Sequence, residues 1–213
     1  MFKKQAYHKL LDEVNGNATV VAVSKMRSVK DIREAYDAGV RDFGENYVQE
    51  LLEKQPLLPG DIRWHFIGHL QRNKVKYIAP FVHLIHGVDS TRLLEEINKQ
   101  GIKNNRIIPC LLQVHIAQEE TKFGFDADEL KQIDPSLFKG ARISGMMGMA
   151  SFSDDPGQVR EEFKLLKRLF DEYSSLAGPS PVLSMGMSGD YKLALEEGSN
   201  MLRIGSALFG VRN

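Results

Sequence analysis

The lysine at position 25 is the residue whose place in the sequence most clearly suggests chemistry. It follows Ser24 and the apolar run 20–23, a pattern typical of a buried strand. An amine desolvated at the end of such a strand has a lowered pKa, and its neutral form can make a Schiff base with a carbonyl compound. The alternative is an ordinary lysine whose amine reaches solvent, and Lys25 alone does not distinguish the two.

A stretch rich in glycine and serine, 184–210, is a candidate anion site. One predicted strand runs into Gly186-Met187-Ser188-Gly189, and the next runs into Gly205-Ser206. Backbone N–H groups at such turns and at a helix start favour a phosphate group, and the hydroxyls of Ser188 and Ser206 add donors. Glycine and serine are also common in turns and caps, so the spacing leaves both interpretations open.

Arg203 interrupts the apolar strand 201–204. Alternation along a strand places it on the face opposite to Leu202 and Ile204. If that face is the interior, Arg203 is a buried cation that needs polar partners; otherwise it emerges at a strand end and pairs with a carboxylate. A reactive lysine, a phosphate site and a buried arginine together match pyridoxal 5′-phosphate, which has an aldehyde, a phosphate group and a ring nitrogen that needs a partner.

Other polar residues carry weaker signals. Asn46 follows the second predicted strand, where it would either hydrogen-bond a ligand on the neighbouring lysine or cap the next helix. We expect His65 to pack in the core and His69 to lie at the surface. His83 and His86 are three residues apart in a strand and therefore face opposite sides, which is poor geometry for a shared metal ion. The sequence predicts no metal site.

These residues must be positioned by a regular alternation of strands and helices. Strands are predicted at 19–23, 40–43, 62–67, 82–86, 107–114, 141–145, 182–185 and 201–204, and helices at 3–14, 29–38, 46–54, 72–78, 90–99, 127–132, 157–176 and 190–197. The alternation implies parallel strands with right-handed crossovers. Eight strands, and no G-x-G-x-x-G turn after the first, favour a closed (β/α)8 TIM barrel over an open doubly wound sheet. Chemistry in such barrels lies at the carboxyl ends of the strands, where Lys25 stands.

Helix ends are marked by capping residues. In 157–176, apolar residues recur at spacings of three and four, Asp155 can cap the start and Pro156 suits the first helical position. Gly39, Gly101 and Gly198 each precede the next predicted strand, and we expect each glycine to end a helix in the left-handed conformation.

Composition narrows the class of protein. The 213 residues carry 28 basic and 28 acidic side chains, so the formal net charge is zero. No basic run interleaved with aromatic residues suggests nucleic-acid binding, and the apolar stretches are too short for a membrane span. The N-terminus lacks the apolar core of a signal peptide. The single cysteine, Cys110, lies in an apolar run, which fits a reducing compartment. We expect one cytoplasmic domain, 1–213, without nucleic-acid or membrane partners.

Seven stretches resemble the pyridoxal phosphate homeostasis family. They are V-A-V-S-K at 21–25, F-G-E-N-Y-V-Q-E at 43–50, W-H-F-I-G-H-L-Q-R-N-K at 64–74, T-K-F-G-F at 121–125, G-M-M-G-M-A at 145–150, S-M-G-M-S-G-D at 184–190 and L-R-I-G-S-A-L-F-G at 202–210. They span nearly the whole chain in order. The family is similar in fold to the barrel domain of alanine racemase, the fold type III of pyridoxal phosphate enzymes.

The resemblance implies a role for each candidate residue. Lys25 would hold the cofactor aldehyde as a Schiff base. Ser188, with the backbone N–H groups of Gly205 and Ser206, would bind the phosphate group. Arg203 would meet the ring nitrogen, and Asn46 would be a further contact.

Departures from alanine racemase weaken the case for an efficient enzyme. The racemase takes a second catalytic base from a C-terminal domain, whereas this chain ends at Asn213, directly after the last barrel element, so we expect that domain to be absent. The racemase has a phosphate-binding tyrosine four residues after its lysine, where this chain has Val29. A guanidinium stays charged, so the ring nitrogen beside Arg203 should stay unprotonated and make a weaker electron sink.

The leading hypothesis is therefore a monomeric protein that carries or buffers pyridoxal phosphate and maintains the balance of vitamin B6 and of amino and keto acids. Pyridoxal-phosphate-dependent apoenzymes would be the recipients of the cofactor. The alternative is a weak amino-acid racemase or related catalyst that uses the same cofactor. A third hypothesis, from a class without the cofactor, is a lysine aldolase that acts on phosphorylated sugars.

Overall fold

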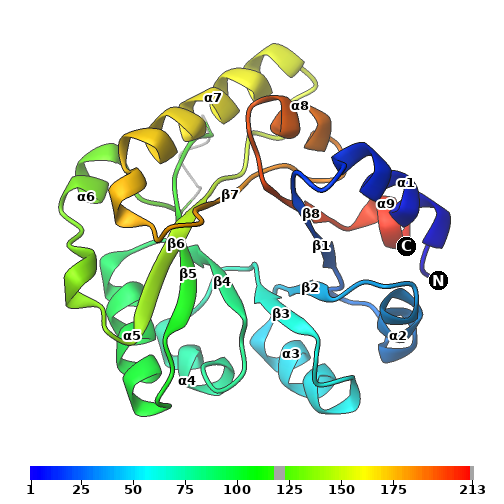
Figure 1. Ribbon diagram of the computed structural model, residues 1–213, viewed down its shortest axis with the longest axis horizontal. Coiled ribbons are helices and arrows are strands. Elements are labelled where there is room, and N and C mark those ends of the chain that lie inside the picture. Colours follow the sequence, from blue (N-terminus) through cyan, green and yellow to red (C-terminus); the bar gives the residue numbers. More distant parts are fainter. Residues whose placement is uncertain (118–122, 212–213) are drawn as a thin grey trace.

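Eight parallel strands close into a barrel in chain order, with helices around the outside (Figure 1). The computed structural model describes residues 1–117 and 123–211. The strands are β1 (Thr19–Val23), β2 (Asp42–Glu45), β3 (Arg63–Phe66), β4 (Leu84–Val88), β5 (Ile108–Gln113), β6 (Ala141–Met147), β7 (Val182–Ser184) and β8 (Met201–Ile204). The predicted (β/α)8 barrel is confirmed. Thr121 and Lys122 of the T-K-F-G-F stretch, and Asn213, lie outside the described residues.

The helices connect successive strands. They are α1 (Lys4–Val14), α2 (Val29–Asp37), α3 (Val48–Lys54), α4 (Val75–Ile78), α5 (Thr91–Lys103), α6 (Ala127–Lys131), α7 (Pro156–Glu172), α8 (Tyr191–Glu196) and α9 (Ser206–Phe209). Short 3-10 turns occupy Gln55–Leu57, Arg72–Lys74, Pro135–Leu137 and Ser174–Leu176. Among the described residues, no helix is both long and apolar enough to span a membrane.

Pairing between the first and last strands closes the barrel. In this register Val21 lies beside Arg203, and Ala22 lies beside Ile204. Alternate residues of β1 therefore pack in two places. Val20 and Ala22 belong to the large core between the strands and the helices, whereas Val21 belongs to a smaller cluster that fills the barrel interior with Leu84, Leu111, Met147 and Met201.

The predicted caps of α7 are confirmed. The Asp155 side chain accepts a hydrogen bond from the N–H of Gly157, and Pro156 occupies the first helical position. Because Pro has no N–H to satisfy, it suits a place where backbone donors lack helical partners. Val159, Phe163 and Leu166 are buried on one face of this helix.

Two of the three predicted glycine stops are confirmed, and the third is wrong. Gly39 and Gly198 have φ values of 103° and 91°. Gly101 instead lies inside α5, which continues to Lys103. A Cβ on Gly101 would approach the carbonyl oxygen of Gly140 to 1.9 Å, so the glycine is needed for close packing of two backbones and not for a turn.

Candidate functional site at the barrel mouth

The loop that carries Lys25 leaves the barrel at the end of β1. Lys25 follows the last residue of β1 by two positions, at the carboxyl end of the strand, and the residue is half-buried. Met26 has a φ of 58°, which turns the chain sharply. Ser28 then caps α2: its hydroxyl accepts a hydrogen bond from the N–H of Asp31, and the Asp31 carboxylate accepts one from the N–H of Ser28. The residues next to Lys25 are thus held in place by local structure.

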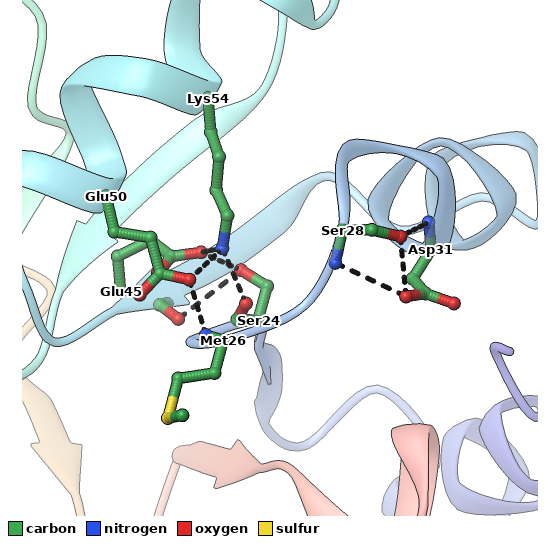
Figure 2. Close-up of polar contacts among 8 residues, drawn as sticks. Ser24, Met26, Ser28, Asp31, Glu45, Glu50 and Lys54 are labelled. Atoms are coloured by element: carbon green, nitrogen blue, oxygen red, sulfur yellow. Dashed lines mark hydrogen bonds and ion pairs between the residues drawn. The ribbon is translucent and has the colours of Figure 1, made fainter.

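A buried lysine on α3 holds this loop from behind (Figure 2). The ammonium group of Lys54 donates hydrogen bonds to the carbonyl oxygen of Ser24 (2.8 Å), to Oε1 of Glu45 (2.8 Å) and to Oε1 of Glu50 (2.6 Å). These three acceptors match its three donors. The Ser24 hydroxyl donates to Oε1 of Glu45 at 2.6 Å, and the N–H of Met26 donates to Glu50. We call Ser24, Glu45, Glu50 and Lys54 the loop clamp.

The loop clamp is a charged cluster in a place with little water. Side chains of Glu45 and Lys54 are 0% and 7% exposed, and Glu50 is 19% exposed. Burial raises the pKa of Glu45, while Lys54 opposes that rise. Oε2 of Glu45 is buried and has no hydrogen-bond partner in the part of the chain that the structure describes. Removing Lys54 would leave the buried carboxylate of Glu45 without a compensating charge, whereas removing Glu45 would leave Lys54 paired with Glu50.

Arg203 lies inside the barrel and not at its surface. Arg203 is only 4% exposed to solvent. Nη1 donates to the carbonyl oxygen and to Oγ of Ser184, at 2.9 and 2.7 Å, and Nη2 donates to the carbonyl oxygen of Gly148 at 2.9 Å. These bonds leave Nε–H without a partner among the described residues. Burial lowers the pKa of Arg203 to about 10, so the guanidinium is still charged at neutral pH.

Ser188, Gly205 and Ser206 come together beside Arg203. Oγ of Ser188, in the loop after β7, accepts hydrogen bonds from the N–H groups of Gly205 (3.2 Å) and Ala207 (3.3 Å). Gly205 follows β8 and occupies the N-cap position of α9, and Ser206 is the first residue of that helix. The hydroxyls of Ser188 and Ser206 and the N–H groups of Gly205 and Ser206 therefore lie together at the carboxyl ends of β7 and β8.

Asn46 follows β2, on the other side of β1. Its Oδ1 is buried and has no hydrogen-bond partner within residues 1–117 and 123–211. The N-cap position of α3 is occupied by Tyr47, and no side chain of the described residues caps that helix, so Asn46 does not have the capping role considered as an alternative. With Gly68, His69 and Lys74 it lines a cavity of about 530 Å³. An unpaired buried oxygen next to a cavity is suited to accept a hydrogen bond from a ligand.

The candidate residues thus occupy four neighbouring positions of the ring, from β7 through β8 and β1 to β2. Sequence reasoning missed the loop clamp and the anchoring of Arg203 by Ser184. Two signals were present: Glu50 and Lys54 are four residues apart on one helix, and Glu45 ends a strand that is buried throughout. Neither signal shows that these side chains converge on the carbonyl of Ser24.

Comparison with known proteins assigns the fold and the family. The family model of the alanine racemase N-terminal domain matches residues 4–213, which defines the class of barrel. A pyridoxal phosphate homeostasis protein of Aquifex aeolicus is 40% identical over 199 residues, which cover 92% of this chain and 87% of the relative. The chain belongs to the pyridoxal phosphate homeostasis protein family, as its sequence motifs suggested.

Solved structures agree with this assignment. PipY of Synechococcus elongatus, in a structure with pyridoxal phosphate bound, has a TM-score of 0.89 and 33% identity, and the match covers 97% of this chain and 99% of PipY. The alanine racemase of Bartonella henselae has a TM-score of 0.77 at 21% identity, with 99% of this chain and 60% of the racemase covered. The second likeness establishes a shared fold alone.

Proposed function

We propose that this protein binds pyridoxal 5′-phosphate at the barrel mouth and carries or buffers it, which maintains the balance of vitamin B6. The observation that carries the proposal is the buried Arg203, charged at neutral pH, whose Nε–H has no partner among the described residues and lies beside the strand that leads to Lys25. The relatives point to the same ligand, since one is a pyridoxal phosphate homeostasis protein and PipY has been solved with pyridoxal phosphate bound.

The donor set fits each part of this ligand. The Lys25 amine would condense with the aldehyde to give an imine, with loss of one water molecule. Ser188 and the N–H groups of Gly205 and Ser206 would bind the phosphate group, with the Gly205 N–H exchanging its present acceptor, Oγ of Ser188, for a phosphate oxygen. Asn46 would contribute a further polar contact. A ring nitrogen would accept a hydrogen bond from Arg203, because a guanidinium has donors and no acceptor.

Arg203 also favours a carrier over a catalyst. When bound, the cofactor supplies an electron sink, and that sink is strongest when its ring nitrogen is protonated. A guanidinium cannot give up a proton at neutral pH, so Arg203 would keep the ring nitrogen neutral. The residues here would therefore hold the cofactor without activating it for carbanion chemistry. We further propose a single domain that acts as a cytoplasmic monomer and delivers the cofactor to dependent apoenzymes.

A visible spectrum and an intact mass after borohydride reduction test the proposal. Wild-type protein incubated with pyridoxal phosphate should turn yellow and gain the mass of a reduced pyridoxyl group. Lys25→Ala should show neither change, although its thermal midpoint should match the wild type. A wild type that stays colourless and unmodified would contradict cofactor binding.

Assays of turnover separate the carrier from the enzymatic alternatives. Loaded protein should leave a panel of L- and D-amino acids unchanged. Racemisation that is lost in Lys25→Ala would establish a racemase instead. A borohydride adduct with the mass of a phosphorylated sugar, formed without added pyridoxal phosphate, would establish an aldolase.

A further inference from the structure

The anchor of Arg203 continues across the barrel as a line of buried polar side chains. Nδ1 of His86 lies 3.2 Å from Oγ of Ser184, and Nε2 of His86 lies 2.9 Å from Nδ1 of His65. Nε2 of His65 lies 3.0 Å from Oδ1 of Asp42. All four side chains are buried. The line begins at the carboxyl end of β7 and finishes at the opposite end of the barrel, where Arg63 pairs with Asp42 through Nε (2.7 Å) and Nη2 (2.5 Å).

The end groups fix the direction of the hydrogen bonds. Arg203 can only donate to Ser184. Although burial raises the pKa of Asp42, hydrogen bonds from His65 and Arg63 lower it to about 2, so Asp42 is a carboxylate that only accepts. Burial holds the pKa of His86 well below its usual value, so His86 is neutral and has one N–H. The hydrogen bonds of the line therefore run between Arg203, which only donates, and Asp42, which only accepts.

One arrangement satisfies every polar hydrogen on the line. The Ser184 hydroxyl donates to Nδ1 of His86, Nε2–H of His86 donates to Nδ1 of His65, and Nε2–H of His65 donates to Asp42. In the reverse arrangement His65 is charged and His86 donates to Ser184, so the Ser184 hydroxyl hydrogen has no acceptor among the contacts described. Buried donors without acceptors are costly. The first arrangement is therefore favoured, with both rings neutral and protonated on Nε2.

We propose that Ser184, His86, His65 and Asp42 form an interior hydrogen-bond chain that positions Arg203 for the ring nitrogen of the bound cofactor. The inference rests on the proposed function, which it deepens. No ion pair among the described residues includes Arg203, although a buried guanidinium needs compensation. Asp190 supplies part of that compensation, because its charge raises the pKa of Arg203 against the effect of burial. The chain adds to it, because it ends on the Asp42 carboxylate and polarises Ser184 as an acceptor.

Such an arrangement restricts the guanidinium to one orientation. Its Nη1 and Nη2 groups are fixed by Ser184 and Gly148, so Nε–H is left for a ligand. An apolar set of side chains like Val21 and Leu111, which fill the same interior, would pack as well but would leave Nη1 short of an acceptor. The four residues of the chain are positioning residues, since they act through Arg203.

Nitrogen NMR of the histidine rings in the cofactor-free protein tests the chain by itself. The expected spectrum at neutral pH has His65 and His86 both neutral and both protonated on Nε2. Ser184→Ala should disturb the His86 signals, and Asp42→Asn should disturb those of His65. A charged His65, or either ring protonated on Nδ1, would overturn the proposed chain. This result does not depend on whether pyridoxal phosphate binds.

Release of pyridoxal phosphate tests the positioning role. Loss of one hydrogen bond to a charged group should speed release from Ser184→Ala about tenfold, and Ser184→Thr, which keeps the hydroxyl, should restore the slower rate. His83→Gln is the matched control. The His83 ring lies 5.3 Å from the His65 ring and makes no side-chain hydrogen bond with the described residues, so its release rate should equal that of the wild type.

Two outcomes would contradict the positioning role. Equal release from wild type, Ser184→Ala and Asp42→Asn would do so, as would equal acceleration in His83→Gln. Failure of the wild type to bind the cofactor would instead contradict the proposed function. The histidine ring spectra would still decide whether the interior hydrogen-bond chain exists. Thermal midpoints of the variants show whether each one folds.

Discussion

The two ends of the candidate site are supported in different ways. Behind Lys25, the loop clamp lies between the barrel wall and α3 and is built from charged groups within 2.8 Å of one ammonium. Behind Arg203, the interior chain is built from a hydroxyl and two imidazole rings, and the nearest carboxylate of that chain is at its far end. The first support acts on a backbone loop, and the second acts on a side chain.

This difference follows from what each end must do. An amine that reacts with an aldehyde has to be able to lose its proton, and the clamp holds the main chain on both sides of Lys25 through Ser24 and Met26. A guanidinium that meets a ring nitrogen must stay charged and correctly aimed. Neutral groups can aim it without placing an anion beside the ligand.

The largest expected effect comes from breaking the loop clamp. Lys54→Met removes the ammonium that balances the buried carboxylate of Glu45, and an unpaired buried charge costs about 3–5 kcal/mol. We expect a loss of that size in the free energy of unfolding, measured by urea titration. Lys131→Met is the control, because Lys131 pairs with Asp128 at an exposed site and should change stability by less than about 1 kcal/mol. Similar small losses in both variants would show that the clamp does not hold the loop.

Acid should weaken the interior chain. The pKa of Asp42 falls from 3.8 to about 2 on folding, since the hydrogen bonds from His65 and Arg63 outweigh burial. A lowered pKa contributes stability above the unfolded value, and that stability is lost as pH falls through the folded value. The difference corresponds to about 2 kcal/mol at neutral pH. Urea titrations between pH 5 and pH 2 (about the range over which Asp42 titrates) should show this loss in the wild type and not in Asp42→Asn.

The loop clamp should respond to pH with the opposite sign. The pKa of Glu45 is raised from 4.5 by burial, so its contribution to stability is present below 4.5 and is lost as pH rises through the higher folded value. Glu45→Gln should therefore gain stability relative to the wild type as pH rises from acid to neutral. A relative loss over that range would mean that the Lys54 ion pair outweighs burial.

The smallest effect is expected at the phosphate end. Ser188→Ala removes one hydroxyl while the N–H groups of Gly205 and Ser206 remain, so affinity for pyridoxal phosphate should fall by about 1 kcal/mol, or roughly fivefold. Titration of the visible absorbance measures this change. Ser206→Ala, which removes an exposed hydroxyl, provides a comparison at the same turn. If Ser188→Ala binds pyridoxal phosphate with the affinity of the wild type, the Ser188 hydroxyl is not part of the phosphate site.

Much of the fold and some of the site could be predicted from the sequence. The apolar runs predicted all eight strands, although β2 and β4 each lie two residues later in the chain than predicted. Lys25 and Arg203 were recognisable because a charged residue in or after a buried strand is costly. The same argument also indicates that both belong to one end of a parallel barrel.

The supports of the site could not be predicted in the same way. His65 was expected to pack in the core, which is confirmed by its 1% exposure, but its two hydrogen bonds depend on the register of three strands. Ser184 and His86 are 98 residues apart and meet only because the barrel closes. Long-range pairing of this kind has no local pattern in the sequence.

The most direct test of the account is the ring-nitrogen signal of 15N-labelled pyridoxal phosphate in the loaded protein. If Lys25 and Arg203 hold the cofactor as a carrier would, the ring nitrogen is a neutral pyridine nitrogen that accepts a hydrogen bond. Its signal should show this state at every pH where Arg203 is charged. A pyridinium signal at neutral pH would contradict the account, because it would mean that Arg203 does not face the ring and that the cofactor is prepared for catalysis.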